Sequence, residues 1–219
     1  MLILLVAATE PESAWLRSVM GFAKEGSLYV SEARGRRIEL LHTGIGMVNT
    51  SFQLGKYLAV KRPDLAINFG IAGSFDYGRR LGSVVEVVSD TLSELGASTP
   101  DKFLDLQAMG FPLMEWGGRL WFNRLENPAP STLDVVQVKG ITVNTVHGEP
   151  GAIETVKKRW NPDIETMEGA AFFHAMLYEG IPFFAFRGIS NHVELRDRSK
   201  WQIGLAAEQV QRFIKKEVL

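Results

Sequence analysis

The stretch of sequence that best defines the fold is Leu65-Ala66-Ile67-Asn68-Phe69-Gly70-Ile71-Ala72-Gly73. Its first half, 65–69, is mostly apolar and predicts a strand that is buried on both faces of a sheet. The glycine-rich half follows the predicted end of that strand. A similar arrangement occurs at 38–42, an apolar run followed by Thr43-Gly44-Ile45-Gly46, and residues 2–8 form a third apolar run. Together these runs predict the interior of an α/β sheet.

Helical patterns alternate with these strands. One helix is predicted from Thr9-Glu10-Pro11-Glu12 to about Ala23, and others at 47–60, 168–178 and 201–216. Further strands are predicted at 84–88 and 182–189, and two more, 133–138 and 141–146, are predicted to pair about Lys139-Gly140. Residues 95–131 predict an irregular excursion beside the sheet. Strand–helix alternation over 219 residues, with no linker-like stretch, predicts a single α/β domain.

Candidate site residues follow the ends of the predicted strands. Glu12 comes after the first strand, Gly44 and Gly46 after the second, Gly73 after the third and Asn191 after the last. Open α/β sheets bind their ligands at the carboxyl ends of the strands. We therefore expect these residues to meet in one site.

Composition limits the possible functions. Lys and Arg number 24 and Asp and Glu 25, mixed along the chain, so no surface for nucleic acid or membrane is expected. Cysteine is absent, which excludes disulfides and thiolate nucleophiles. The run 2–8 is too short to span a bilayer and has no basic segment before it, so a cytoplasmic location is expected. We expect neither metal nor cofactor, because no short metal-ligand spacing joins the histidines at 42, 147, 174 and 192.

Two motifs have plain structural alternatives. Gly44-Ile45-Gly46 could begin a dinucleotide fingerprint, but Asn49 occupies the third glycine position, so NAD binding is not supported. Thr9-x-x-Glu12 matches a capping box, in which the glutamate accepts a hydrogen bond from the cap residue. The pattern alone favours capping. The position of Glu12 beside the strand ends is also suited to a base that deprotonates water.

Two charged residues, Glu168 and Arg187, suggest a site. Glu168 starts a predicted helix, where the helix dipole stabilises an anion. It could equally hold a vicinal diol, since two ribose hydroxyls can donate to one carboxylate. Arg187 lies within an apolar strand, where a buried guanidinium needs partners. A site carboxylate such as Glu12 is the expected partner.

Four strings together resemble the purine nucleoside phosphorylase and nucleosidase superfamily: Thr43–Asn49, Asn68–Gly73, Thr166–Ala171 and Arg187–Asn191. The pattern is closest to the methylthioadenosine/S-adenosylhomocysteine nucleosidases. Within that branch it is most similar to the futalosine hydrolases of the alternative menaquinone pathway. The resemblance covers nearly the whole chain, with 95–131 least matched. It implies a three-layer fold with a twisted mixed sheet flanked by helices, and an enzyme that forms a homo-oligomer.

The resemblance also implies roles for individual residues. Glu12 falls on the base that activates water, and Arg187 on the arginine that orients the glutamate and the water. Asn191 falls on the residue that contacts the purine as it leaves. The other implied contacts are with the ribose and the base, and they fall on Met167, Glu168, Ser190, Gly73, Ala72 and Val146.

Asn191 stands where an adenine-specific relative carries a carboxylic acid. Adenine presents a donor amine at C6 and an acceptor at N7, which a protonated acid matches. Hypoxanthine presents an acceptor O6 and gains an N7–H as the bond breaks, which an amide matches. The amide cannot supply the proton, so water must do so. A mispaired aminopurine would be disfavoured by roughly 10³-fold or more. The sequence therefore predicts a 6-oxopurine nucleoside as substrate.

The expected reaction is hydrolysis of the N-glycosidic bond through an oxocarbenium-like state. Lys and Arg are absent from 43–49 and 68–74, where a phosphorylase would need phosphate clamps, so water is the expected nucleophile. The alternatives are an adenine nucleosidase, a phosphorylase and a non-catalytic nucleoside-binding protein. If the substrate is futalosine, Arg196 or Arg198 could pair with its 5′ aromatic carboxylate. The mixed charges of 194–198 also fit a solvated loop, which the pattern favours.

Overall fold

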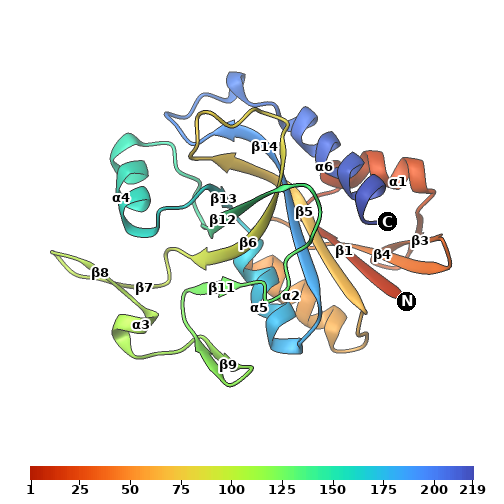
Figure 1. The fold of residues 1–219 in the computed structure, drawn as a ribbon, viewed down its shortest axis with the longest axis horizontal. Helices are drawn as coiled ribbons and strands as arrows, with labels where there is room; N and C mark the ends of the chain where they lie inside the picture. Colours follow the sequence, from red (N-terminus) through yellow and green to blue (C-terminus); the bar gives the residue numbers. More distant parts are fainter.

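The computed structural model describes residues 1–219 and is built around one mixed ten-stranded sheet (Figure 1). The strands of this sheet are β1 (Leu2–Ala7), β2 (Ala23–Glu25), β3 (Leu28–Ala33), β4 (Arg36–His42), β5 (Leu65–Ser74), β6 (Val84–Leu92), β11 (Arg124–Glu126), β12 (Val136–Thr142), β13 (Ile164–Thr166) and β14 (Phe183–His192). They follow the order β11-β6-β12-β13-β5-β1-β4-β3-β2, and β14 pairs with both β5 and β6. Consequently β5, β14, β6, β12 and β13 close into a ring.

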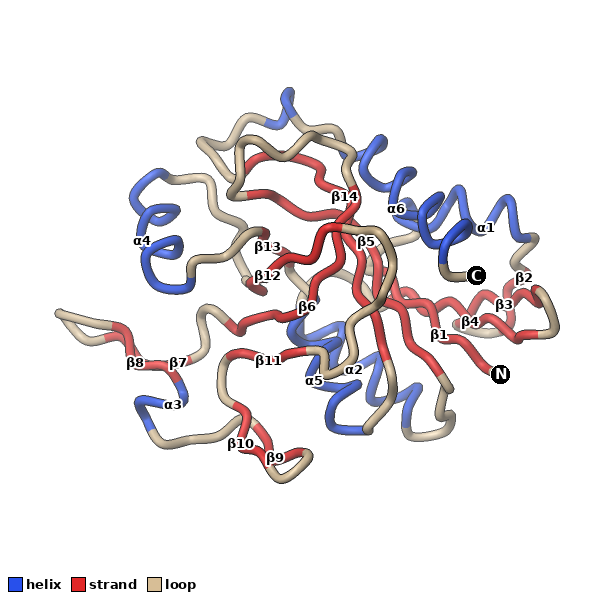
Figure 2. Tube along the Cα trace, in the orientation of Figure 1, coloured by secondary structure: helices blue, strands red, loops and turns tan.

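Helices cover both faces of the sheet (Figures 1 and 2). They are α1 (Ala14–Met20), α2 (Met47–Leu58), α3 (Leu106–Met109), α4 (Pro150–Trp160), α5 (Gly169–Glu179) and α6 (Ile203–Glu217), with two 3-10 turns, η1 (Pro11–Ser13) and η2 (Arg198–Lys200). Helices α1 and α6 lie on one face, and α2 and α5 pack together on the other. The predicted α/β fold with a twisted mixed sheet flanked by helices is confirmed.

The apolar run of β1 explains the three layers. Ile3 and Leu5 pack with Ile214 of α6 in one core, whereas Leu4 and Val6 pack in the other core, which lies beneath α2 and α5. Successive side chains of a strand point to opposite faces, so a strand between two helical layers must be apolar throughout. This is why the run shows no polar alternation.

Three predicted elements differ from the structure. The predicted strand pair about Lys139-Gly140 is wrong, because β12 runs through both residues between β6 and β13. Gly140 is needed for close packing: a Cβ there would lie 2.9 Å from Asp90 Oδ2. Strand β5 continues through the glycines to Ser74, and Gly70 leaves room for Glu12, whose Oε1 would lie 2.6 Å from an added Cβ.

The third difference is at the first helix. It is divided into η1 and a short α1, which ends at Gly21 in the left-handed conformation, with φ of 63°. The chain then forms the β2–β3 hairpin, which the sequence did not predict. Helix α4 and strand β13 were also not predicted.

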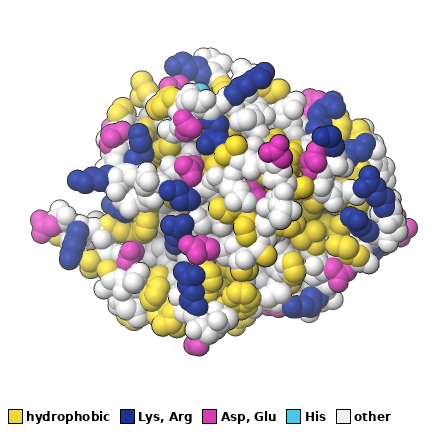
Figure 3. All heavy atoms as spheres, in the orientation of Figure 1, with side chains coloured by type: hydrophobic (Ala, Val, Ile, Leu, Met, Phe, Trp, Pro, Cys, Tyr) yellow, Lys and Arg dark blue, Asp and Glu magenta, His cyan; other side chains and the backbone are white.

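The excursion at 95–131 contains short hairpins beside the sheet, at the lower left of Figure 2. The first pairs β7 (Gly96–Ser98) with β8 (Phe103–Asp105), and the second pairs β9 (Met114–Trp116) with β10 (Arg119–Trp121). The segment then returns to add β11 to the sheet edge. Charged side chains of both signs are mixed over the face shown in Figure 3. No helix has the length and apolar character that crossing a membrane requires.

Candidate active site

A cavity of about 570 Å³ lies at the carboxyl ends of β1, β5 and β14, which run parallel. This is where an open α/β sheet binds ligands. The predicted site residues that line it are Glu12, Ala72, Gly73, Val146, Met167, Glu168, Ser190 and Asn191. Arg187 is the exception, because it is 2% exposed and lies off the cavity surface. These lining residues come from five separate parts of the chain. Gly44 and Gly46, which were also expected in the site, do not line the cavity, whereas Ile45 between them does.

The Glu12 carboxylate makes the capping contact and also faces the cavity. Its Oε2 accepts from the Thr9 backbone N–H at 2.9 Å and from the Thr9 hydroxyl at 2.8 Å. Its Oε1 accepts a longer bond, 3.3 Å, from the Ile71 N–H of β5. The two predicted roles are thus compatible: one oxygen is held by Thr9, and the other is directed toward the strand that forms the cavity floor.

Glu168 precedes the first turn of α5 and connects it to the glycine loop before α2. Its Oε1 accepts a 2.8 Å hydrogen bond from the Gly46 N–H. Gly46 has φ of 90°, a conformation that strongly favours glycine. Burial raises the pKa of the Glu168 carboxyl, and the Gly46 bond and the charge of Arg187 oppose that rise. Glu168 and Met167 both line the cavity beside this loop.

Arg187 does not form the predicted ion pair with Glu12. Its guanidinium donates to the Phe186 carbonyl oxygen at 2.9 Å and to Oδ1 of Asn68 on the adjacent strand β5. Burial lowers the pKa of Arg187, while the nearby carboxylates of Glu168, Asp90 and Glu12 oppose that effect. The guanidinium therefore donates to a carbonyl oxygen and an amide oxygen, and it interacts with the three carboxylates through charge alone.

A bulge in β14 directs Ser190 and Asn191 into the cavity. Ile189 pairs with Ala72 of β5 and Asn191 pairs with Gly73, so Ser190 is the extra residue between them. A bulge of this kind breaks the strand's alternation and re-aims the side chains that follow. The Ser190 hydroxyl donates to Asn191 Oδ1 at 2.7 Å, and Asn191 Nδ2 donates to the His192 carbonyl at 3.0 Å.

Two groups beside the cavity were not predicted as site residues. Asp90, at the end of β6, is 1% exposed and accepts from the Thr142 hydroxyl at 2.8 Å. That hydroxyl in turn accepts from the Ala170 N–H in the first turn of α5, at 2.7 Å. Burial raises the pKa of Asp90 to about 7. An acid at the end of an apolar strand was the only signal in the sequence.

The second group is the pair His147 and Glu165, which both line the cavity. His147 Nδ1 lies 2.6 Å from Glu165 Oε2, and the His147 backbone N–H donates to Oε1 at 3.0 Å. The carboxylate raises the pKa of His147. Glu165 adjoins the Thr166–Ala171 string, but its partner is 18 residues away, so their pairing depends on the fold. No cluster of three or more acidic or histidine side chains is arranged to hold a metal ion.

A profile of the phosphorylase superfamily matches residues 3–218, and the chain belongs to that superfamily. Futalosine hydrolase of Thermus thermophilus is 31% identical over 189 residues, covering 84% of this chain and 82% of that protein. A 5′-methylthioadenosine/S-adenosylhomocysteine nucleosidase of Anoxybacillus flavithermus is 26% identical, covering 86% of this chain and 84% of that protein. The structure of futalosine hydrolase from Helicobacter pylori strain 26695 has the same fold, with a TM-score of 0.80, 14% identity, and 98% and 96% of the two chains covered.

Proposed function

We propose that the protein hydrolyses the N-glycosidic bond of a 6-oxopurine nucleoside. The specific substrate proposed is futalosine, cleaved to hypoxanthine and dehypoxanthine futalosine in menaquinone biosynthesis. The observation that carries this proposal is the amide of Asn191, which lies in the cavity beside Gly73. An amide has a donor for O6 and an acceptor for the N7–H that forms on the leaving base. The likeness to the futalosine hydrolase of Thermus thermophilus supports the same substrate.

The proposed mechanism assigns one task to each charged group. Glu12 takes a proton from water through Oε1, while Thr9 holds the other oxygen. Glu168 accepts from the ribose hydroxyls, and Met167 lies against the sugar. Arg187 attracts the carboxylates of Glu168 and Glu12 through its charge, without a hydrogen bond to either. Asn191 stabilises the departing hypoxanthine, whose N7 takes its proton from water because an amide has no proton to give.

Water is the proposed nucleophile because the cavity has few cations. Among its lining residues Arg196 is the only Lys or Arg, and it belongs to the loop after β14. A phosphorylase needs cationic or N–H clamps on the phosphate beside the anomeric carbon. The observed lining instead offers the carboxylates of Glu12 and Glu168 there, which would repel phosphate.

Arg196 is the proposed partner of the 5′ carboxylate. Its guanidinium lies 5.1 Å from the centroid of the Trp201 ring, and both residues line the cavity, whereas Arg198 does not. Trp15 of α1 also lines the cavity. An arginine beside the Trp201 ring suits an aromatic carboxylate, because it can pair with the charge while the ring contacts the apolar part.

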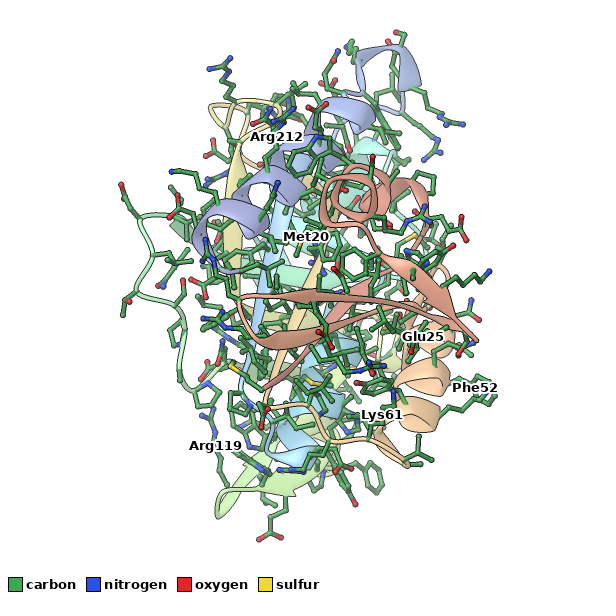
Figure 4. All side chains as sticks on the ribbon, turned by 90° about the vertical axis from the view of Figure 1, so that its right-hand side faces the viewer. Met20, Glu25, Phe52, Lys61, Arg119 and Arg212 are labelled. Carbon is green, nitrogen blue, oxygen red and sulfur yellow. The ribbon has the colours of Figure 1, made fainter.

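A homo-oligomer in the cytoplasm is also proposed. Exposed apolar side chains at the start of α2 support an interface: Ile45, Val48 and Phe52 are 58%, 80% and 62% exposed. Figure 4 shows Phe52 projecting away from the domain. Surfaces with several exposed apolar side chains commonly mark protein contacts.

Product analysis tests the reaction type. A hydrolase should convert futalosine to the free sugar product at the same rate in about 50 mM phosphate and in phosphate-free buffer. A sugar 1-phosphate, or a rate that depends on phosphate, would establish a phosphorylase instead. Methylthioadenosine, assayed in parallel, tests the second candidate, an adenine nucleosidase, which the relative from Anoxybacillus flavithermus favours.

A further inference from the structure

Glu165, Gly73 and Asn191 lie side by side on three adjacent strands. Gly73 of β5 is the register partner of Glu165 on β13 and also of Asn191 on β14. Register partners on neighbouring strands direct their side chains to the same face of a sheet. All three residues line the cavity, so the carboxylate and the amide stand on either side of a position that has no side chain.

Three side chains bound the space above Gly73. A Cβ added at Gly73 would lie 3.0 Å from Val193 Cγ2, 3.1 Å from Asn191 Nδ2 and 3.5 Å from Glu165 Cγ. Neighbouring strands are about 4.8 Å apart, so the backbones of Glu165 and Asn191 are separated by roughly two strand spacings. A gap of that width, floored by glycine, accommodates the edge of a planar base. A purine over Gly73 that contacts Asn191 with its N7 and O6 edge would present its N1 toward Glu165.

His147 fixes the carboxylate in this wall. It donates through its backbone N–H to Oε1 and lies within hydrogen-bond distance of Oε2 through Nδ1. With a carboxylate as partner, Nδ1 carries the proton. Glu165 is 4% exposed, yet no lysine or arginine forms an ion pair with it. Each oxygen of a carboxylate held in this way retains a lone pair for a further donor.

We propose that Glu165 is a second specificity residue, which accepts a hydrogen bond from N1–H of the 6-oxopurine while His147 positions it. The inference rests on the proposed function. A 6-oxopurine carries hydrogen on N1 and therefore donates there, whereas adenine has an unprotonated N1 that would face the carboxylate lone pairs. Asn191 and Glu165 thus select the same base through adjacent parts of its edge. Glu165 matches the N1 position, and Asn191 matches O6 and N7.

Substitution of Glu165 by glutamine gives the sharpest test. In Glu165→Gln only one oxygen remains for the two His147 donors, which contact Oε1 and Oε2 in the wild type. The amide nitrogen that replaces the other oxygen offers N1 an N–H donor in place of an acceptor. Because that group repels N1–H and suits the acceptor N1 of adenine, Glu165→Gln should lower the inosine-to-adenosine ratio of kcat/KM on the order of 10²-fold. Glu94→Gln is the matched control. Glu94 raises the pKa of His147 through its charge and does not line the cavity. The inosine-to-adenosine ratio of Glu94→Gln should therefore stay within about twofold of the wild-type ratio.

A wild-type measurement keeps the proposal testable if the variant does not fold. The unaltered protein should cleave inosine on the order of 10²-fold faster than 1-methylinosine, which lacks the N1–H. Glutamine has the size of glutamate, so a narrower preference between these two substrates in Glu165→Gln reports a lost hydrogen bond and not relieved crowding. An unchanged inosine-to-adenosine ratio in a folded variant, or equal wild-type rates on inosine and 1-methylinosine, would overturn the role of Glu165. A wild-type preference for adenosine would instead overturn the proposed function itself.

Discussion

The Ser190 hydroxyl donates to Oδ1 of Asn191 at 2.7 Å, and the same hydroxyl lies 3.1 Å from the Ala72 carbonyl oxygen. This contact, together with the bond from Nδ2 to the His192 carbonyl, fixes which end of the amide is the acceptor and which is the donor. One lone pair and one N–H remain free for the ligand. Base selection therefore depends on a hydrogen-bond network that the bulge in β14 creates.

The first prediction concerns the identity of the base. Asn191→Asp should lower kcat/KM for inosine by roughly 10³-fold, because the carboxylate has no donor for O6. Activity on adenosine should rise, since a protonated acid can serve both the 6-amine and N7. The measurement is kcat/KM on each nucleoside, with Ser190→Ala as the comparison. That variant should lose activity on both nucleosides and shift their ratio less. An Asn191→Asp enzyme that keeps the wild-type ratio would contradict the donor–acceptor argument.

A second prediction separates the two roles of Glu12. Glu12→Gln should reduce kcat by about 10²- to 10⁴-fold, the usual contribution of a general base, and should leave nucleoside affinity within a few-fold. Thr9→Val is the matched control, because it removes the hydroxyl bond to Oε2 and keeps the carboxylate. Thr9→Val should lower the free energy of unfolding by about 1 kcal/mol and should reduce kcat far less than Glu12→Gln does. If both variants lose activity equally, Glu12 serves the turn and not the reaction.

Gly70 provides an independent test of Glu12 geometry. An added Cβ would lie 2.6 Å from Glu12 Oε1, and the nearest atom belongs to the flexible end of a side chain. Gly70→Ala should therefore displace the carboxylate and lower kcat at least about 10-fold, since small misplacements of reacting groups are costly. Gly55→Ala is the control: nothing lies near its Cβ position in α2, and it should stabilise the protein by about 0.5–1 kcal/mol with unchanged kcat. Full activity in Gly70→Ala would argue against Glu12 as the base.

The buried Asp90 predicts a pH-dependent stability. Burial raises its folded-state pKa from 3.8 to about 7, so the folded protein retains a proton that the unfolded chain releases. Stability is therefore fully present below about pH 4 and falls as pH rises toward 7, by roughly 3–5 kcal/mol for this group. Asp90→Asn removes that dependence while it keeps an acceptor for Thr142. In urea unfolding, the free energy of unfolding of Asp90→Asn should rise relative to that of the wild type between pH 5 and pH 8. Parallel profiles would mean that Asp90 is ionised at both values.

Much of the fold could be predicted because local sequence determined it. Strand β1 has apolar side chains on both faces because both faces of the sheet are covered there. The sequence pattern alone indicates this. Gly140 was wrongly predicted to form a turn. Glycine is needed there because the carboxylate of Asp90, 50 positions earlier, occupies the space that a side chain would fill. A glycine required by a distant neighbour looks the same in sequence as a glycine required by a turn.

The site shows the same division. Glu12, Gly73 and Asn191 were predicted to meet because each follows the end of a predicted strand, and the structure places all three around one cavity. The partner of Arg187 was predicted wrongly as Glu12. The side chain that accepts its hydrogen bond is Asn68, which becomes its neighbour only when β14 pairs with β5. Interactions set by strand register cannot be inferred before the register is known.

The central claim is that the protein releases a 6-oxopurine, and a competition assay tests it most directly. An equimolar mixture of inosine and adenosine, without phosphate, is incubated with the protein, and the free bases are separated and quantified at low conversion. The expected result is hypoxanthine in excess of adenine by roughly 10²- to 10³-fold, the discrimination that mispaired hydrogen bonds impose. Adenine as the main product would contradict the claim.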